Sequence, residues 1–180
     1  MKKFVALLRG INVSGQKKIK MSELNTLFED IGFQQIETYI QSGNVIFSSK
    51  ELSKDQLTRI ISSGIKNKFH FEVEVIIITP QEIDQVLKNN PFIKKKKDTE
   101  RLYVTFLSDK PSVELINKFK ENDFSPEEYY IDEKKIYLFL PNGAGKAKLN
   151  NNYFENKLKV RCTTRNWKTV TILSELVKTH

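Results

Sequence analysis

Four segments carry the kinds of groups that proteins use to hold anions. They are RGIN (residues 9–12), QSGN (residues 41–44), LPNGAGKAKL (residues 140–149) and CTTRNW (residues 162–167). Together they supply amide, guanidinium and ammonium donors, which bind phosphates and carboxylates. We therefore expect a ligand site built from these loops. The candidate ligand-binding residues are Arg9, Asn12, Gln41, Ser42, Asn44, Gly143, Gly145, Lys146, Lys148, Arg165, Asn166 and Trp167.

Several of these residues also have a purely structural interpretation. Gly43 and Asn44 tolerate positive φ, which suits a tight hairpin between two strands. Thr164 or Asn166 can cap the last helix, and Trp167 can pack on the core. The planar donor fork of Arg165 fits a phosphate or carboxylate, and it could equally pair with an acidic side chain of the fold.

The glycine-rich segment GAGKAKL does not match a nucleotide-binding motif. A P-loop requires glycine at position 140 and Ser or Thr at position 147, where this chain has Leu140 and Ala147. The dinucleotide-binding GxGxxG pattern is absent as well. Two interpretations stay open: a flexible strand-to-helix connection, or an anion site where glycines precede a helix with free N–H groups.

Residue types for metal binding or nucleophilic catalysis are poorly placed in the sequence. No group of His, Cys, Asp or Glu has metal-ligand spacing, and neither histidine is near Cys162. We expect no metal site and no hydrolase triad, and no carboxylate pair indicates acid–base catalysis. The sequence makes no prediction of a catalytic residue, a cofactor or an oligomeric state, and it leaves open whether the protein is an enzyme.

The charge of the chain is positive and uneven. The net charge is +8, and from Ala144 onward there are eight basic and two acidic residues, a balance of +6. Such an excess suits an anionic partner, while a solvated lysine-rich surface is the alternative.

Hydropathy and cysteine content indicate a folded cytoplasmic protein. Hydrophobic residues make up 39% of the chain, enough for a core. We expect no membrane association because no apolar run reaches the length of about 18 residues that a membrane span needs. The apolar run at residues 4–8 ends at Arg9 and is too short for a signal peptide. Cys162 is the only cysteine, which excludes an internal disulfide.

The elements that must position the loops follow the order β-α-β-β-α-β in the first part of the chain. We expect strands at residues 4–8, 36–40, 45–48 and 73–78. Ser22 is the expected cap of a first helix that ends at Gly32, and Ser53 with Gln56 forms a capping box for a second. This is the ferredoxin-like order. A third helix opens at Thr79 and stops before Pro91.

A similar order follows a lysine-rich segment. IKKKKDTE (residues 93–100) is the expected linker, either solvated or a tether for nucleic acid. We expect a strand at 102–107, a helix at 112–121, a hairpin of 129–131 with 136–140, and helices at 147–159 and 166–178. The fold class is therefore α+β, with two ferredoxin-like βαββα(β) halves and antiparallel sheets. The predicted domains are residues 1–93 and residues 98–180.

Four segments in this order, RGINVSGQKKIKM, TYIQSGNVIF, LPNGAGKAKL and TTRNW, resemble the signatures of domain-of-unknown-function family 1697. The resemblance covers essentially the whole chain. It implies a bacterial-type, cytosolic α+β protein with ferredoxin-like subdomains, and no established activity, ligand or catalytic residue. Ala147 stands where the family often has serine, which argues against a nucleophilic or metal-binding hydroxyl there. The matching positions are Arg9, Gly10, Asn12, Gln41, Ser42, Gly43, Asn44, Gly143, Gly145, Lys148, Thr164, Arg165, Asn166 and Trp167.

Three functions are compatible with the sequence. The first is binding, with or without transfer chemistry, of a small anionic ligand such as a nucleotide in a cleft between the halves. The second is a nucleic-acid-binding module that uses the basic C-terminal region, although GNVIFSS offers one Phe where base stacking needs alternating aromatics. The third is a structural or oligomeric interaction protein. In the first, Arg9, Lys146, Lys148 and Arg165 would contact anionic oxygens, and the ligand would be oriented by Gln41, Ser42 and Asn44.

Overall fold

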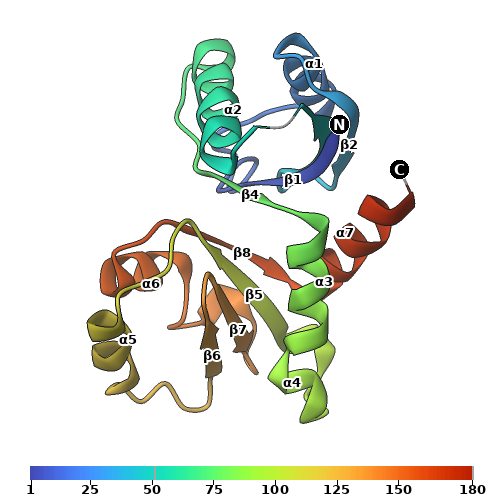
Figure 1. The fold of residues 1–180 in the computed structure, drawn as a ribbon. Coiled ribbons are helices and arrows are strands. Elements are labelled where there is room, and N and C mark those ends of the chain that lie inside the picture. Colours follow the sequence, from blue (N-terminus) through green and yellow to red (C-terminus); the bar gives the residue numbers. More distant parts are fainter. Residues whose placement is uncertain (51, 180) are drawn as a thin grey trace. The chain divides into compact units, whose positions relative to one another are not determined.

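The computed structural model describes residues 1–50 and 52–179 and contains two four-stranded antiparallel sheets (Figure 1). The strand order is β2-β3-β1-β4 in the first sheet and β6-β7-β5-β8 in the second. In both, the first and third strands of a repeat lie in the centre, which is the ferredoxin-like arrangement. The α+β prediction with two such halves is confirmed.

Packing divides the chain into two compact units. The first contains Met1–Asp84 and Leu173–His180, and the second contains Gln85–Ile172. The division cuts α3 (Pro80–Asn89) and α7 (Trp167–Thr179), so each of these helices has an end in each unit. The repeated element order, by contrast, predicts halves of residues 1–93 and 98–180, and that division stays a prediction.

The first unit packs two helices on one face of its sheet (Figure 1). Strand side chains alternate between faces, so Phe4, Ala6 and Leu8 of β1 point toward these helices. Phe47 lies at the centre, with ring centroids 4.6 to 5.8 Å from those of three other phenylalanines. Full burial of each such side chain contributes about 1.5–3 kcal/mol. The elements are β1 (Lys2–Leu8), α1 (Met21–Asp30), β2 (Gln34–Tyr39), β3 (Asn44–Ser49), α2 (Lys54–Phe69) and β4 (Val75–Ile78).

The predicted N-terminal cap is correct for one helix of this unit and wrong for the other. The capping box of Ser53 and Gln56 is present at α2, as predicted. The prediction of Ser22 as the cap of α1 is wrong, because the N-cap is Lys20 and Ser22 lies in the first turn. Ile19 is buried and Met21 packs on the core, so tertiary packing starts the helix before the serine.

The second unit repeats the plan, with α5 and α6 over one face of its sheet (Figure 1). Phe119 lies at the centre of this core, with ring centroids 5.0 to 5.9 Å from those of Phe124, Tyr129, Tyr153 and Phe154. The elements are α4 (Pro91–Lys94), a 3-10 turn η1 (Thr99–Arg101), β5 (Leu102–Leu107), α5 (Val113–Lys120), β6 (Glu128–Asp132), β7 (Lys135–Phe139), η2 (Ala144–Lys146), α6 (Asn151–Leu158) and β8 (Cys162–Asn166).

Two predicted elements near the C-terminus need correction. The helix expected from residue 147 begins at Asn151, because the side chain of Asn150 accepts a hydrogen bond from the Tyr153 N–H at 3.0 Å and caps it. CTTRN, predicted to be a loop, forms β8 and pairs with β5. The polar side chains conceal this strand, although threonine favours extended backbone.

Part of the lysine-rich segment (residues 93–100) packs on side chains of the second unit. The Lys95 ammonium lies 5.6 Å from the centroid of the Phe92 ring. The Lys97 ammonium lies 4.5 Å from the centroid of Phe139 and 2.5 Å from a carboxylate oxygen of Glu128. Two of the four consecutive lysines therefore pack on the second unit, which the interpretation as a solvated linker did not anticipate.

Backbone hydrogen bonds at the strand ends show that equivalent strands of the two sheets pair in the same way. Leu8 N donates to Gly43 O at 2.8 Å, and Arg9 N donates to Glu74 O at 2.9 Å. The same pair recurs in the second unit, from Leu107 N to Lys134 O at 2.9 Å and from Ser108 N to Arg161 O at 2.8 Å. The repeat is therefore structural as well as topological.

Glu82 fixes the start of α3 and provides a test of its electrostatics. Burial opposes ionisation, but hydrogen bonds from the Lys54 ammonium and the Thr79 N–H lower the pKa of Glu82 below 4.5. A carboxyl group whose pKa is lower in the folded chain than in the unfolded chain stabilises the fold above its unfolded pKa. This stabilisation is lost as the pH falls through the folded pKa. Glu82→Gln should cost about 1 kcal/mol at pH 7, a modest figure because the pair is partly exposed.

Urea denaturation of both proteins at pH 7 and pH 3 measures this effect. Glutamine keeps the volume and the hydrogen-bonding pattern of a capping box, so the variant isolates the charge. The difference in the free energy of unfolding should shrink toward zero at pH 3. A difference that is the same at both pH values would contradict the assignment.

Candidate functional site

The RGIN and QSGN loops lie side by side at one end of the first sheet. The side-chain amide of Asn12 donates hydrogen bonds to Gln41 O and Ile19 O, both at 2.9 Å. Its Oδ1 accepts one from Ile19 N at 2.9 Å. The side chain of Asn12 therefore joins the two predicted loops by hydrogen bonds to their backbone.

Asn44 has a structural role that differs from the predicted one. It is the first residue of β3, fully buried, and its amide donates to Tyr39 O and Ser42 Oγ, both at 3.0 Å. The prediction that Gly43 and Asn44 form the turn is correct only for Gly43, whose φ is 84°. Tyr39 pairs with Asn44, so residues 40–43 form the loop.

The exposed part of this loop pair has an unusual backbone. Ile40 has a φ of 50° and is 48% exposed. A β-branched residue with positive φ is a genuine outlier, and such strain costs about 1–3 kcal/mol. Gln41 is exposed beside it, and Arg9 and Ser42 are half-buried.

The predicted residues of the second unit gather at the other end of their repeat. Phe139, at the end of β7, pairs with Leu102, and Asn166, at the end of β8, pairs with Tyr103. Both partners lie at the start of β5. The loops of the first unit instead follow the end of β1, so the two groups occupy opposite ends of equivalent sheets.

The glycine-rich loop of the second unit already binds a carboxylate of the chain itself. The backbone N–H groups of Lys148 and Leu149 donate to the two carboxylate oxygens of Glu127 at 2.8 and 2.9 Å. The Lys148 ammonium lies 5.2 Å from the centroid of the Phe124 ring. Gly145 and Lys146 remain exposed on the turn η2.

Arg165 lies on the face of the second sheet that points away from α5 and α6. The residue is only 8% exposed, and its Nη1 donates to Thr163 Oγ1 at 2.8 Å and to Thr164 O at 3.0 Å. Burial lowers the pKa of Arg165 to about 10. Asn166 caps α7 by accepting a hydrogen bond from Thr169 N at 2.8 Å, and Trp167 is half-buried.

A polar chain on the opposite face of β8 was not predicted. The hydroxyls of Thr105 and Thr164 are 2.7 Å apart, and the Thr164 hydroxyl donates to Asn151 Oδ1 at 2.7 Å. The Cys162 thiol is also directed at Asn151. This chain ties α6 to two strands, which gives Thr164 a structural role.

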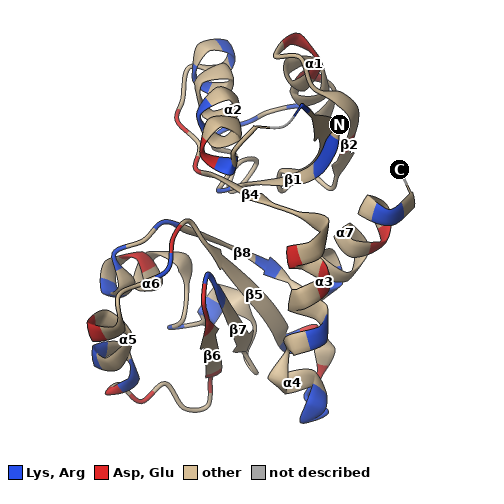
Figure 2. Cartoon of the chain, in the orientation of Figure 1, with Lys and Arg blue, Asp and Glu red and all other residues tan. Residues whose placement is uncertain are grey.

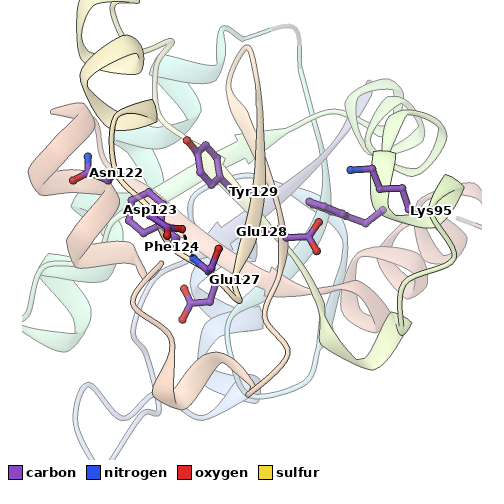
Figure 3. A pocket seen from close by; sticks show the side chains of 9 residues that line it. Lys95, Asn122, Asp123, Phe124, Glu127, Glu128 and Tyr129 are labelled. Atoms are coloured by element: carbon purple, nitrogen blue, oxygen red, sulfur yellow. Dashed lines mark hydrogen bonds between the residues drawn. The ribbon is translucent and has the colours of Figure 1, made fainter.

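Two cavities differ in charge. One, of about 300 Å³ in the second unit, is lined mainly by acidic and aromatic side chains (Figure 3). Its carboxylates Asp123, Glu127 and Glu128 are hydrogen-bonded within the chain. The other, of about 550 Å³ in the first unit, is lined by Lys2, Lys3, Phe4, Thr79, Pro80 and Gln81. It contains none of the predicted ligand-binding residues.

Basic residues are spread over helices and strands of both units (Figure 2). Those that follow Ala144 are divided between the two units, with Lys178 in the first and Arg161 in the second. Several also have partners: Lys178 pairs with Asp84 at 3.0 Å, and Arg161 pairs with Glu155 at 3.5 Å.

Metal-binding clusters and membrane-spanning helices are both absent from residues 1–50 and 52–179. No group of three or more His, Cys, Asp or Glu side chains in these ranges is placed to hold a metal ion. No helix in the same ranges has both the length and the hydropathy needed to cross a bilayer.

Comparison with known proteins places the chain in a family. No curated protein matches significantly. A solved structure, that of the conserved bacterial protein SP0830 from Streptococcus pneumoniae, is 25% identical, covers 99% of each chain and has a TM-score of 0.75. A family model matches residues 1–137, which include the RGIN and QSGN loops but neither LPNGAGKAKL nor TTRNW. The chain therefore belongs to the family described as "Protein of unknown function (DUF1697)".

Proposed function

We propose that the protein binds a small anionic ligand, such as a nucleotide, through the RGIN and QSGN loops of its first unit. The observation that carries this proposal is the strained and exposed backbone at Ile40, the first residue of a loop that hydrogen bonds otherwise fix. Strained residues persist only where their surroundings determine them, and they cluster at binding sites.

The chemistry of the loop pair fits an anion. The Arg9 guanidinium is a planar donor that can grip two oxygens of a phosphate or carboxylate. The Gln41 amide and the Ser42 hydroxyl would orient the rest of the ligand. Asn12 and Asn44 would position these groups without touching the ligand, since their side chains hold the loops together.

A small ligand is favoured over nucleic acid by the residues of the first sheet. Single-stranded RNA usually stacks on exposed aromatic side chains of such a sheet. The face that points away from α1 and α2 instead carries the aliphatic residues Val5, Leu7 and Ile46, all fully buried.

A thermal-shift screen with nucleotides, sugar phosphates and short RNA tests the proposal. A stabilising nucleotide or sugar phosphate should lose at least tenfold in affinity with Arg9→Ala. The matched control is Arg59→Ala, which removes an exposed arginine from α2. Binding that is unchanged in Arg9→Ala, or a response only to RNA that weakens steeply with salt, would refute the proposal.

A further inference from the structure

Two large apolar residues are exposed on the loops of the proposed site. Ile40 begins the loop of residues 40–43 and is 48% exposed, and Val13 follows Asn12 in the neighbouring loop and is 56% exposed. The hydrogen bond from the Asn12 amide to Gln41 O joins the two loops at the residues next to these two. Single exposed apolar residues are ordinary on protein surfaces, so what matters is that both of these lie on loops that also present polar donors.

The segment that carries Val13 is a short hairpin. Val13 pairs with Gln16 as an isolated antiparallel bridge, and the Gln16 N–H donates to Val13 O at 2.9 Å. The two residues between them, Ser14 and Gly15, have φ of 51° and 73°, as a two-residue turn of type I′ requires. The backbone of Val13 is therefore held by this turn on one side and by the bonds of Asn12 on the other.

Ile40 is an unusual residue for its backbone conformation. Its φ is 50°, a value at which turns normally use glycine or asparagine. A β-branched side chain is strained there, and at this position it is also partly left in water. Asparagine or glycine would satisfy the turn with less strain. We therefore attribute the isoleucine to the apolar surface that it presents beside the donors of the site.

We propose that Ile40 and Val13 contact the ring of the ligand's base, so that the ligand is a nucleotide and not a sugar phosphate. This inference rests on the proposed function, in which the Arg9 guanidinium binds the phosphate. Aliphatic side chains contact the face of a planar ring by dispersion and by removing both surfaces from water. Gln41 follows Ile40, and its exposed amide can both donate to and accept from the polar edge of the same base. The hydroxyl groups of a sugar would instead lose hydrogen bonds to water against these side chains.

Isothermal titration calorimetry of the full chain with adenosine monophosphate and ribose 5-phosphate tests the inference. The two probes share a phosphate and a ribose and differ in the base. The wild type should bind adenosine monophosphate about tenfold more tightly than ribose 5-phosphate. Ile40→Asn/Val13→Thr should abolish this preference and leave the affinity for ribose 5-phosphate unchanged. Asparagine tolerates positive φ and threonine keeps the β-branched shape of valine, so the double variant should fold as stably as the wild type.

The matched control is Val113→Thr, which replaces a valine that is 69% exposed at the start of α5 in the second unit. It should leave both affinities unchanged. Arg9→Ala should weaken the binding of both probes alike, which reports on the proposed function and not on the base contact.

The outcomes separate the two proposals. If the wild type binds neither probe, both proposals fail. If it binds the two probes equally, or if the double variant keeps the preference, only the contact of Ile40 and Val13 with the base is wrong. A double variant that changes the sedimentation coefficient of the chain but neither affinity would make these residues a contact between copies, which also overturns the inference.

Discussion

Replacing Gly43 with alanine should lower the free energy of unfolding by about 3 kcal/mol. A Cβ at this position would lie 2.8 Å from Ile11 Cδ1 and 2.8 Å from Leu8 Cβ, closer than carbon atoms can pack. The φ of 84° adds the cost of a left-handed backbone for an L-residue. Leu8 is in a central strand and cannot retreat, so the QSGN loop must move away from β1. Urea denaturation gives the free-energy difference.

Gly10→Ala is the matched control for that experiment. Gly10 has a φ of 71°, but no atom lies within 4 Å of the Cβ position. Only the cost of a left-handed backbone applies, so we expect the free energy of unfolding to fall by about 1 kcal/mol. Equal losses in the two variants would show that the close approach of the QSGN loop to β1 carries no energetic cost.

The parts of the fold that the sequence predicts well are those determined by local patterns. The apolar residues of β1 and β5 mark buried strands, and the spacing of Leu24, Leu27 and Phe28 marks the buried side of α1. Ser53 and Gln56 lie within one helical turn of each other, so their capping box is visible in the sequence. Alternating elements of this kind are sufficient to indicate two ferredoxin-like halves.

The candidate site depends on long-range contacts, and the sequence predicts these poorly. Asn12 bonds to Gln41, 29 residues away, and Glu127 binds the amide of Lys148, 21 residues away. Neither spacing is a known motif. Thr164, a predicted alternative cap of the last helix, was misplaced for a related reason, because its partner Thr105 lies 59 residues away in a neighbouring strand. The composition of the loops identified hydrogen-bond donors, but it did not identify the groups to which they donate.

Arg165→Met is expected to stabilise the protein by about 2 kcal/mol at pH 7. Burial lowers the pKa of Arg165 to about 10, so the folded state disfavours its charge. A shift of this size corresponds to about 3 kcal/mol at neutral pH, since one pKa unit is about 1.4 kcal/mol. Methionine fills a similar volume without a charge, and buried ions replaced in this way often give more stable proteins.

The sign follows from proton binding. Above about pH 10 the folded chain releases the Arg165 proton while the unfolded chain still holds it, so the cost of burying this charge falls as the pH rises. Below pH 10 both states are charged, and the full cost of burial is present. Methionine should remove that cost at pH 7, less the loss of the hydrogen bonds of Arg165, among them those to Thr163 and Thr164.

Urea denaturation of the variant and the wild type at pH 7 measures this difference. Higher stability of the variant would confirm that the cost of burying the guanidinium exceeds the gain from its hydrogen bonds. Lower stability would show that the hydrogen bonds of Arg165, among them those to Thr163 Oγ1 and Thr164 O, outweigh the cost of burial, which makes Arg165 a structural residue of β8.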